Sequence, residues 1–304
     1  MSALDSAVEA TVRIGSPLLF AGLGEMILER SGMLNIGIEG VMLMGAFSGF
    51  YAGWLSGSPW IGALAGMLGG MVLMLIFAYF AITISADQIV TGMAINLLAL
   101  GITGTANMAL GESQAGGVGQ APAFTAMVPS LRELSVLGPF LFSQTFLTWL
   151  AITLVPLLWI YMERTERGLE LRAVGENPAA AEASGIGVNA CRWKACCVAG
   201  MLCGLGGAFL TLSQTASFAA NCTKGRGFVA LAAVVLGRYG TFGTTVACLF
   251  FGAAFYARDA FPSQNVPTDL VEMLPYVLTL AVLCVKFRSR SAPNGLGKPY
   301  HTAA

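Results

Sequence analysis

The sequence predicts an all-α membrane protein, a polytopic helix bundle with about 8–9 membrane segments that include a broken or half helix. Of its 304 residues, 56% are hydrophobic and only 11% are charged, whereas soluble domains carry roughly 25% charged residues. Apolar residues gather in stretches close to the roughly 20 residues that a helix needs to cross the hydrocarbon core. Glycines also recur every fourth residue, a spacing that favours close packing of transmembrane helices. This spacing is found at Gly45, Gly49, Gly53 and Gly57, and again at Gly62, Gly66 and Gly70.

Each span is placed by its run of apolar residues. The first four are expected at residues 11–28, 34–55, 60–84 and 89–110, ahead of a loop at 111–142 that is rich in glycine, proline and serine. The others are expected at 144–162, 193–213, 245–257 and 270–285. The N-terminus lacks a basic region and a cleavage site, so we do not expect it to be a removable signal peptide.

The stretch 228–236 is apolar but too short to cross the membrane alone. Glycines stand on both sides of it, at Gly225 and Gly227 and at Gly237 and Gly240. We therefore expect a half helix here. Such a helix survives at membrane depth only where protein or a water-filled cavity covers its ends.

A charged interruption at residues 163–188 contains a short helix whose ends can be read from its caps. Asn177 suits the N-cap, Pro178 the first helical position, and Gly185 the left-handed residue after the last turn. A helix of about two turns is marginal in water, so it needs a surface to lie on. Its small residues would let a partner's backbone come close. The alternative is a solvated connector with one helical turn.

Lysines and arginines set the orientation, because they favour the cytoplasmic side of a membrane. If the stretch 163–188 is cytoplasmic, five spans precede it and the N-terminus lies outside. If the half helix then returns the chain to the inner face, 11 of the 16 basic residues lie inside and 5 lie outside.

Polar groups within apolar stretches are costly in a bilayer and often functional. Asn35 and Glu39 lie where glycines interrupt the second span, and Glu39 either satisfies loose backbone donors at a helix start or lines a pathway. Gln88 and Asn96 lie at the start of the fourth span and within it, where Asn96 bonds either a neighbouring helix or a substrate. Asp87 suits the N-cap of that span.

The stretch around Glu39 and the half helix form a pair of glycine-interrupted segments in the two halves of the chain. Such pairs point to a binding site near the membrane midplane. The other interpretation is that the half helix only packs.

Several chemistries lack the residues that they need. The single histidine, His301, lies in a polar tail and the seven cysteines form no CxxC pair, so we expect no metal site and no cofactor. No Cys/His or paired-carboxylate arrangement occurs at helical spacing within a span, so we expect no catalytic residue. Gly297-Lys298 is followed by Pro299, which leaves no phosphate-binding loop. A formal net charge of zero argues against nucleic acid as a partner.

Four motifs occur along the chain: LNIGIEG at 34–40, DQIVTGMAINLLALGITG at 87–104, GENPAAAEASGI at 175–186 and GRGFVALAAVVLG at 225–237. In these motifs, and over residues 16–287, the chain resembles permease subunits of nucleoside and simple-sugar ABC importers, in the ribose/branched-chain-amino-acid permease superfamily. Asp87 stands where such permeases more usually have asparagine, and Thr241 where they usually have proline.

The resemblance implies a single transmembrane permease domain over residues 1–304, in which residues 163–190 form a cytoplasmic coupling loop. Its short helix would dock into a groove on an ATPase subunit. The residues expected to couple to the ATPase are Gly175, Glu176, Asn177, Pro178, Ala180, Ala183 and Gly185. The polar residues expected along the translocation pathway are Asn35, Glu39, Gln88 and Asn96.

The resemblance also implies the function, that of a permease subunit that imports nucleosides across a bacterial inner membrane. The alternatives are a simple sugar or a riboflavin-like vitamin as cargo, or an ion-coupled secondary transporter with Glu39 as its titrating carboxylate. The chain itself is not expected to be an enzyme. The expected partners are cytoplasmic ATPase subunits, a second permease subunit in a homo- or heterodimer, an extracytoplasmic substrate-binding protein and membrane lipid.

Overall fold

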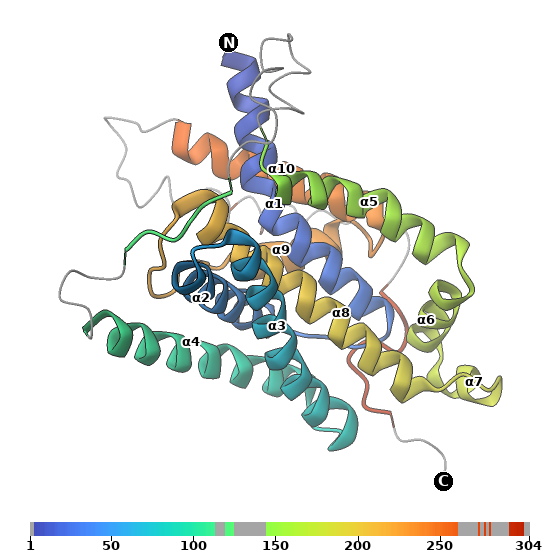
Figure 1. Ribbon diagram of the computed structural model, residues 1–304. Helices are drawn as coiled ribbons and strands as arrows, with labels where there is room; N and C mark the ends of the chain where they lie inside the picture. Colours follow the sequence, from blue (N-terminus) through green and yellow to red (C-terminus); the bar gives the residue numbers. More distant parts are fainter. Residues whose placement is uncertain are drawn as a thin grey trace.

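The computed structural model describes residues 3–112, 119–124, 144–260, 273, 277, 280 and 292–300 (Figure 1). Its helices are α1 (Ala3–Arg30), α2 (Ile38–Ser56), α3 (Pro59–Ala78), α4 (Gln88–Glu112), α5 (Phe146–Arg164), α6 (Glu166–Glu176), α7 (Pro178–Ala183), α8 (Val188–Phe209), α9 (Arg226–Leu236) and α10 (Thr241–Ala260). Two of them continue as π-helical turns, α3 into Tyr79–Thr83 and α8 into Leu210–Thr215. The all-α prediction is confirmed for the described residues.

Five of the described helices are long and apolar enough to cross a membrane. They are Ala7–Arg30, Pro59–Thr83, Gln88–Leu110, Phe146–Arg164 and Val188–Thr215. The expected total of eight or nine segments is therefore not confirmed. The helices α2 and α10 overlap predicted spans without being among the five, and the predicted span 270–285 lies largely outside the described residues.

The second span begins later than predicted. The expected start was residue 34, but α2 starts at Ile38 because residues 31–37 form a non-helical turn after α1. Gly32 in this turn has a φ of +84°, which lies in the left-handed region that glycine tolerates best. The break that glycines predicted near Glu39 thus falls just before it.

The centre of the bundle is made of α1, α2, α3, α8 and α10, while α4 and α5 lie along opposite sides of it (Figure 1). Most of α1 and α8 is buried, whereas only a minority of the residues of α4 and α5 is buried. The exposed side of α4 carries large apolar residues such as Val90, Met93 and Leu97. Such a surface is stable only against lipid or another protein.

Glycines bring the backbones of α2, α3 and α8 into direct contact, as their spacing predicted. A side-chain carbon added at Gly66 of α3 would lie 2.9 Å from the carbonyl oxygen of Gly45 in α2. One added at Gly70 would clash with the backbone of Gly200 and Gly204 in α8. No larger residue fits at these positions, which makes the three-helix contact rigid.

The helix α9 is the half helix that the sequence predicted, with 11 residues. It starts beside Glu39 of α2. The loop between α9 and α10 reaches the end of α1, where the Nε of Arg30 donates a 2.6 Å hydrogen bond to the carbonyl oxygen of Tyr239. The helix α10 then runs back along α1. Because Gly175 of α6 also packs against Arg30, the chain returns at Tyr239 to the end of the bundle that carries α6 and α7. We call this the α6–α7 end.

Candidate functional site: the α6–α7 loop and the interrupted helices

The helix α7 has the caps that its sequence predicts. The side-chain Oδ1 of Asn177 accepts a 3.2 Å hydrogen bond from the N–H of Ala180, and Pro178 occupies the first turn. Gly185 has a φ of +84°. The N–H of Ile186 donates to the carbonyl oxygen of Ala181 at 3.0 Å, which closes the helix with a left-handed cap.

One side of α7 faces inward and the other is open. Ala181 is 4% exposed and packs with Val174 and Val188 in a small apolar cluster. In contrast, Ala180 and Ala183 are exposed, so the open side of α7 presents small side chains. Of the other residues expected to couple to the ATPase, Gly175 is buried at the end of α6, while Glu176 and Gly185 are exposed.

The four polar residues expected along the pathway all bond the backbone of interrupted segments. The Oδ1 of Asn35 accepts a 2.8 Å hydrogen bond from the N–H of Gly37, and the Oε1 of Gln88 accepts one of 2.8 Å from Leu34. Asn96 of α4 accepts from the N–H of Gly40 at 2.7 Å and donates to the carbonyl oxygen of Ile36 at 2.9 Å. These side-chain bonds satisfy backbone N–H and C=O groups, in and beside the turn 31–37, that have no helical hydrogen-bond partner.

Glu39 joins the two interrupted segments. Its two carboxylate oxygens accept hydrogen bonds from the N–H groups of Gly225 and Gly227, both at 2.7 Å, at the start of α9. The structure thus shows Glu39 satisfying backbone donors at a helix start, one of the two roles that the sequence left open. That helix is α9, far along the chain, rather than α2.

Asp87 caps α4 as expected. Its Oδ1 accepts 2.9 Å hydrogen bonds from the N–H groups of Ile89 and Val90. The aspartate therefore performs an N-cap role for which asparagine would also serve.

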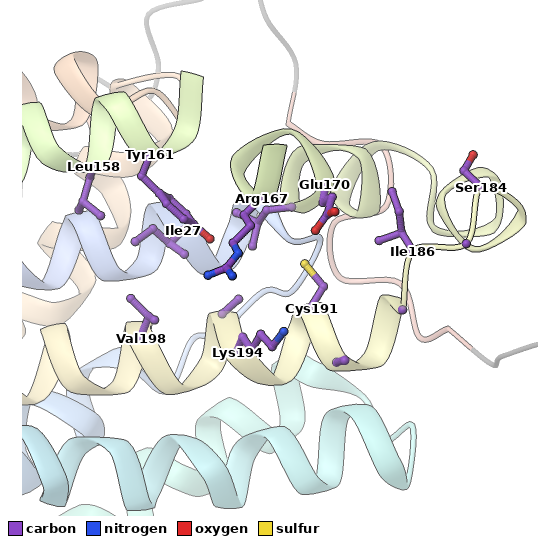
Figure 2. A pocket seen from close by; sticks show the side chains of 15 residues that line it. Ile27, Leu158, Tyr161, Arg167, Glu170, Ser184, Ile186, Cys191, Lys194 and Val198 are labelled. Atoms are coloured by element: carbon purple, nitrogen blue, oxygen red, sulfur yellow. The ribbon is translucent and has the colours of Figure 1, made fainter. Parts of the chain in front are cut away.

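A cavity of about 750 Å³ lies between α1, α5, α6 and α8, close to α7 (Figure 2). Apolar side chains such as Ile27, Leu158 and Val198 line it, together with the charged side chains of Arg167 and Lys194. No sequence motif predicts this cavity, because it forms only where α1 packs beside α5, α6 and α8, which come much later in the chain.

Three buried ionisable residues were also missed. Glu25 and Glu29 of α1 and Arg192 of α8 are each at most 1% exposed. The Oε1 of Glu25 accepts a 3.3 Å hydrogen bond from the N–H of Asn35, which ties α1 to the same turn. The spacing of Glu25 and Glu29, two acids four residues apart in an apolar span, could have identified them as a buried pair.

A glycine-packed bundle with a half helix, an interrupted helix and a short capped helix outside the bundle has the architecture of a membrane permease. The chain belongs to the family described as "Branched-chain amino acid transport system / permease component", whose model matches residues 7–283.

Two relatives are similar over almost their whole length. The guanosine ABC transporter permease protein NupQ of Bacillus subtilis is 36% identical, over 98% of this chain and 97% of its own. The nucleoside ABC transporter permease protein NupC of Lactococcus lactis is 33% identical, over 94% of this chain and 93% of its own. Both are permeases rather than ATPases, and this chain is likewise a permease subunit of an ABC transporter.

A solved structure, described as an inward-facing conformation of a transporter of the metal-chelate ABC type, is similar in fold. It superimposes with a TM-score of 0.52 and 15% identity, over 91% of this chain and 84% of the solved one. At this identity the similarity supports the helical permease fold alone.

Proposed function

We propose that this chain is the membrane-spanning subunit of an ATP-driven importer that carries nucleosides into the cytoplasm. The observation that carries the proposal is the 36% identity to a guanosine permease over nearly the full length of both chains. The chain lacks a phosphate-binding loop, so ATP is hydrolysed by partner subunits and the energy reaches this chain through a contact.

That contact is α7, within a cytoplasmic coupling loop at residues 163–190. Its open face of small residues, Ala180 and Ala183, lets an ATPase groove approach closely. Its caps, at Asn177 and Gly185, define where the helix begins and ends. The helix α6 carries this loop against the end of α1, so a push on α7 is transmitted to the bundle through Gly175 and Arg30.

The translocation pathway runs beside the two interrupted segments, with Asn35, Glu39, Gln88 and Asn96 along it. All four side chains bond backbone groups in or beside the interrupted segments, and such segments lie beside a substrate path in membrane transporters. The hydrogen bonds of Glu39 to the start of α9 make the two segments move together.

The chain acts in a bacterial inner membrane with cytoplasmic ATPase subunits, a second permease subunit and an extracytoplasmic substrate-binding protein. The exposed apolar side of α4 supports contact with lipid or with the second permease.

Uptake by whole cells tests the cargo. Cells that express the chain with its neighbouring genes should accumulate radiolabelled guanosine, and unlabelled nucleosides should compete where glucose and riboflavin do not. A Walker-motif variant of the ATPase is the control and should abolish uptake. Competition by glucose but not by nucleosides would overturn the nucleoside proposal, and uptake that follows a proton gradient without ATP would overturn the ABC mechanism.

A further inference from the structure

Residues 292–300 lie across the α6–α7 end, against elements from three other parts of the chain (Figure 1). The N–H of Gly295 donates a 2.9 Å hydrogen bond to the carbonyl oxygen of Gly175, the residue before the end of α6. The N–H of Gly297 donates one of 3.1 Å to the carbonyl oxygen of Gly32, in the turn after α1. This segment therefore bridges α6 and the α1–α2 turn through backbone alone.

Two side chains of the segment add hydrogen bonds, one to α6 and one to α7. The Nδ2 of Asn294 donates a 3.1 Å hydrogen bond to the carboxylate of Glu176, the last residue of α6. The hydroxyl of Tyr300 donates to the carboxylate of Glu182 in α7. This bond raises the pKa of Tyr300, because the neighbouring carboxylate favours the protonated phenol.

The ring of Tyr300 is also part of the apolar packing beneath α7. It packs on the apolar cluster of Val174, Ala181 and Val188, which is the inward side of α7. The guanidinium of the buried Arg192 lies 5.9 Å from its centroid, in a cation–π arrangement. The backbone at Gly295 is so close to Gly175 that a side-chain carbon there would lie 2.7 Å from the Gly175 carbonyl oxygen.

We propose that residues 292–300 are a clamp that fixes the orientation of α7 for ATPase docking, with Asn294 and Tyr300 as its positioning residues. A helix of 6 residues cannot hold itself in place, and its one buried residue, Ala181, offers little apolar area. The clamp supplies contacts on the inward side and leaves Ala180 and Ala183 open. The proposal rests on the docking role of α7.

Amide hydrogen exchange of the purified full-length chain tests the clamp directly. In the variant Asn294→Ala/Tyr300→Ala, amides of residues 180–186 should exchange about tenfold faster than in the wild type, because α7 opens more often once its contacts are lost. Lys298→Ala is the matched control, since Lys298 lies in the same segment and is exposed, and it should leave these rates unchanged. Wild-type exchange rates at 180–186 in the double variant would overturn the clamp.

Binding of the ATPase separates this proposal from the one on which it rests. The double variant should lose most substrate-stimulated ATP hydrolysis, and Tyr300→Phe, which keeps the ring and loses the donor, should lose less. If Ala183→Arg retains the ATPase, docking through α7 is wrong, while the exchange rates still decide whether the clamp exists. If Ala183→Arg releases the ATPase but the double variant couples like the wild type, docking stands and the positioning role of the clamp is wrong.

Discussion

At the scale of single residues, Glu39 connects the two interrupted segments, because it bonds parts of the chain 186 and 188 residues apart. Its carboxylate receives two N–H groups at the first turn of α9, where the helix dipole favours a negative charge. Charge-assisted bonds of this kind are short and stronger than neutral ones. Glu39 is thus the connection through which the half helix α9 is attached to α2.

Replacing Glu39 by glutamine should destabilise this connection. The amide keeps one acceptor oxygen but turns its NH₂ group toward the second N–H, so one buried donor is left unsatisfied at a cost of about 1–3 kcal/mol. The melting temperature in detergent should fall and guanosine uptake with it. Glu163→Gln is the control, because Glu163 forms an exposed 3.0 Å ion pair with Arg172 that contributes at most about 1 kcal/mol. Equal melting temperatures for the two variants would contradict the role of Glu39.

At the scale of elements, two kinds of helix contact matter. The helices α2, α3 and α8 meet backbone to backbone at glycines, while α7 meets the rest of the chain through the small cluster under Ala181 and through the residues that flank it. The glycine contact has no room for a side chain. The α7 contact leaves the face of α7 with Ala180 and Ala183 exposed.

Gly204→Ala tests the close contact. A methyl group there would fall on the carbonyl oxygen of Gly66, so the helices must separate, at a cost of about 1–3 kcal/mol or more. Gly104→Ala in α4 is the matched control, because a side-chain carbon at Gly104 meets open space. It should raise stability by at most about 1 kcal/mol, through the higher helix propensity of alanine. Thermal unfolding of the two variants in the same detergent measures the difference. A Gly204→Ala protein as stable as the control would show that the helices can part freely.

Ala183→Arg tests the exposed face of α7. A bulky charge on a surface that permits close approach should weaken ATPase binding by tenfold or more, about 1.4 kcal/mol. Expression and insertion should stay at wild-type levels, since Ala183 is exposed and outside the bundle. Ala220→Arg is the control, an exposed alanine in the loop between α8 and α9 and outside the coupling loop. Co-purification of the ATPase and uptake should fall together in Ala183→Arg only, and full retention of both would make the loop a simple connector.

At the scale of the whole molecule, local features were predictable and distant contacts were not. The caps of α7, the half helix α9 and the glycine contacts follow from short patterns, because helix ends and helix packing depend on neighbouring residues. The partners of Glu39 and the bridge of residues 292–300 could not be predicted, because no local pattern records which distant backbone N–H or carboxylate will be adjacent. The start of α2 was placed at residue 34 rather than Ile38, since apolar residues continue through the turn.

The topology is a prediction for the whole chain. With all seven native cysteines replaced, a cysteine at Ser184 should react with an impermeant maleimide only from the cytoplasmic side. One at Gln120 should react only from outside, because the N–H of Ala121 bonds the carbonyl oxygen of Ala216, beyond the far end of α8. Both positions are exposed, so their labelling depends on sidedness alone. Reversed labelling would overturn the cytoplasmic assignment of α7.

The clamp also sets an order of events during synthesis. Tyr300 lies 118 residues after its partner Glu182, so at 5–20 residues per second α7 leaves the ribosome roughly 6–24 s before the residue that holds it. Until then a nascent permease presents the ATPase with a helix that is not yet fixed. Assembly of the transporter would therefore wait for translation to pass α10, and a chain cut short there would enter the membrane without becoming an ATP-consuming pore.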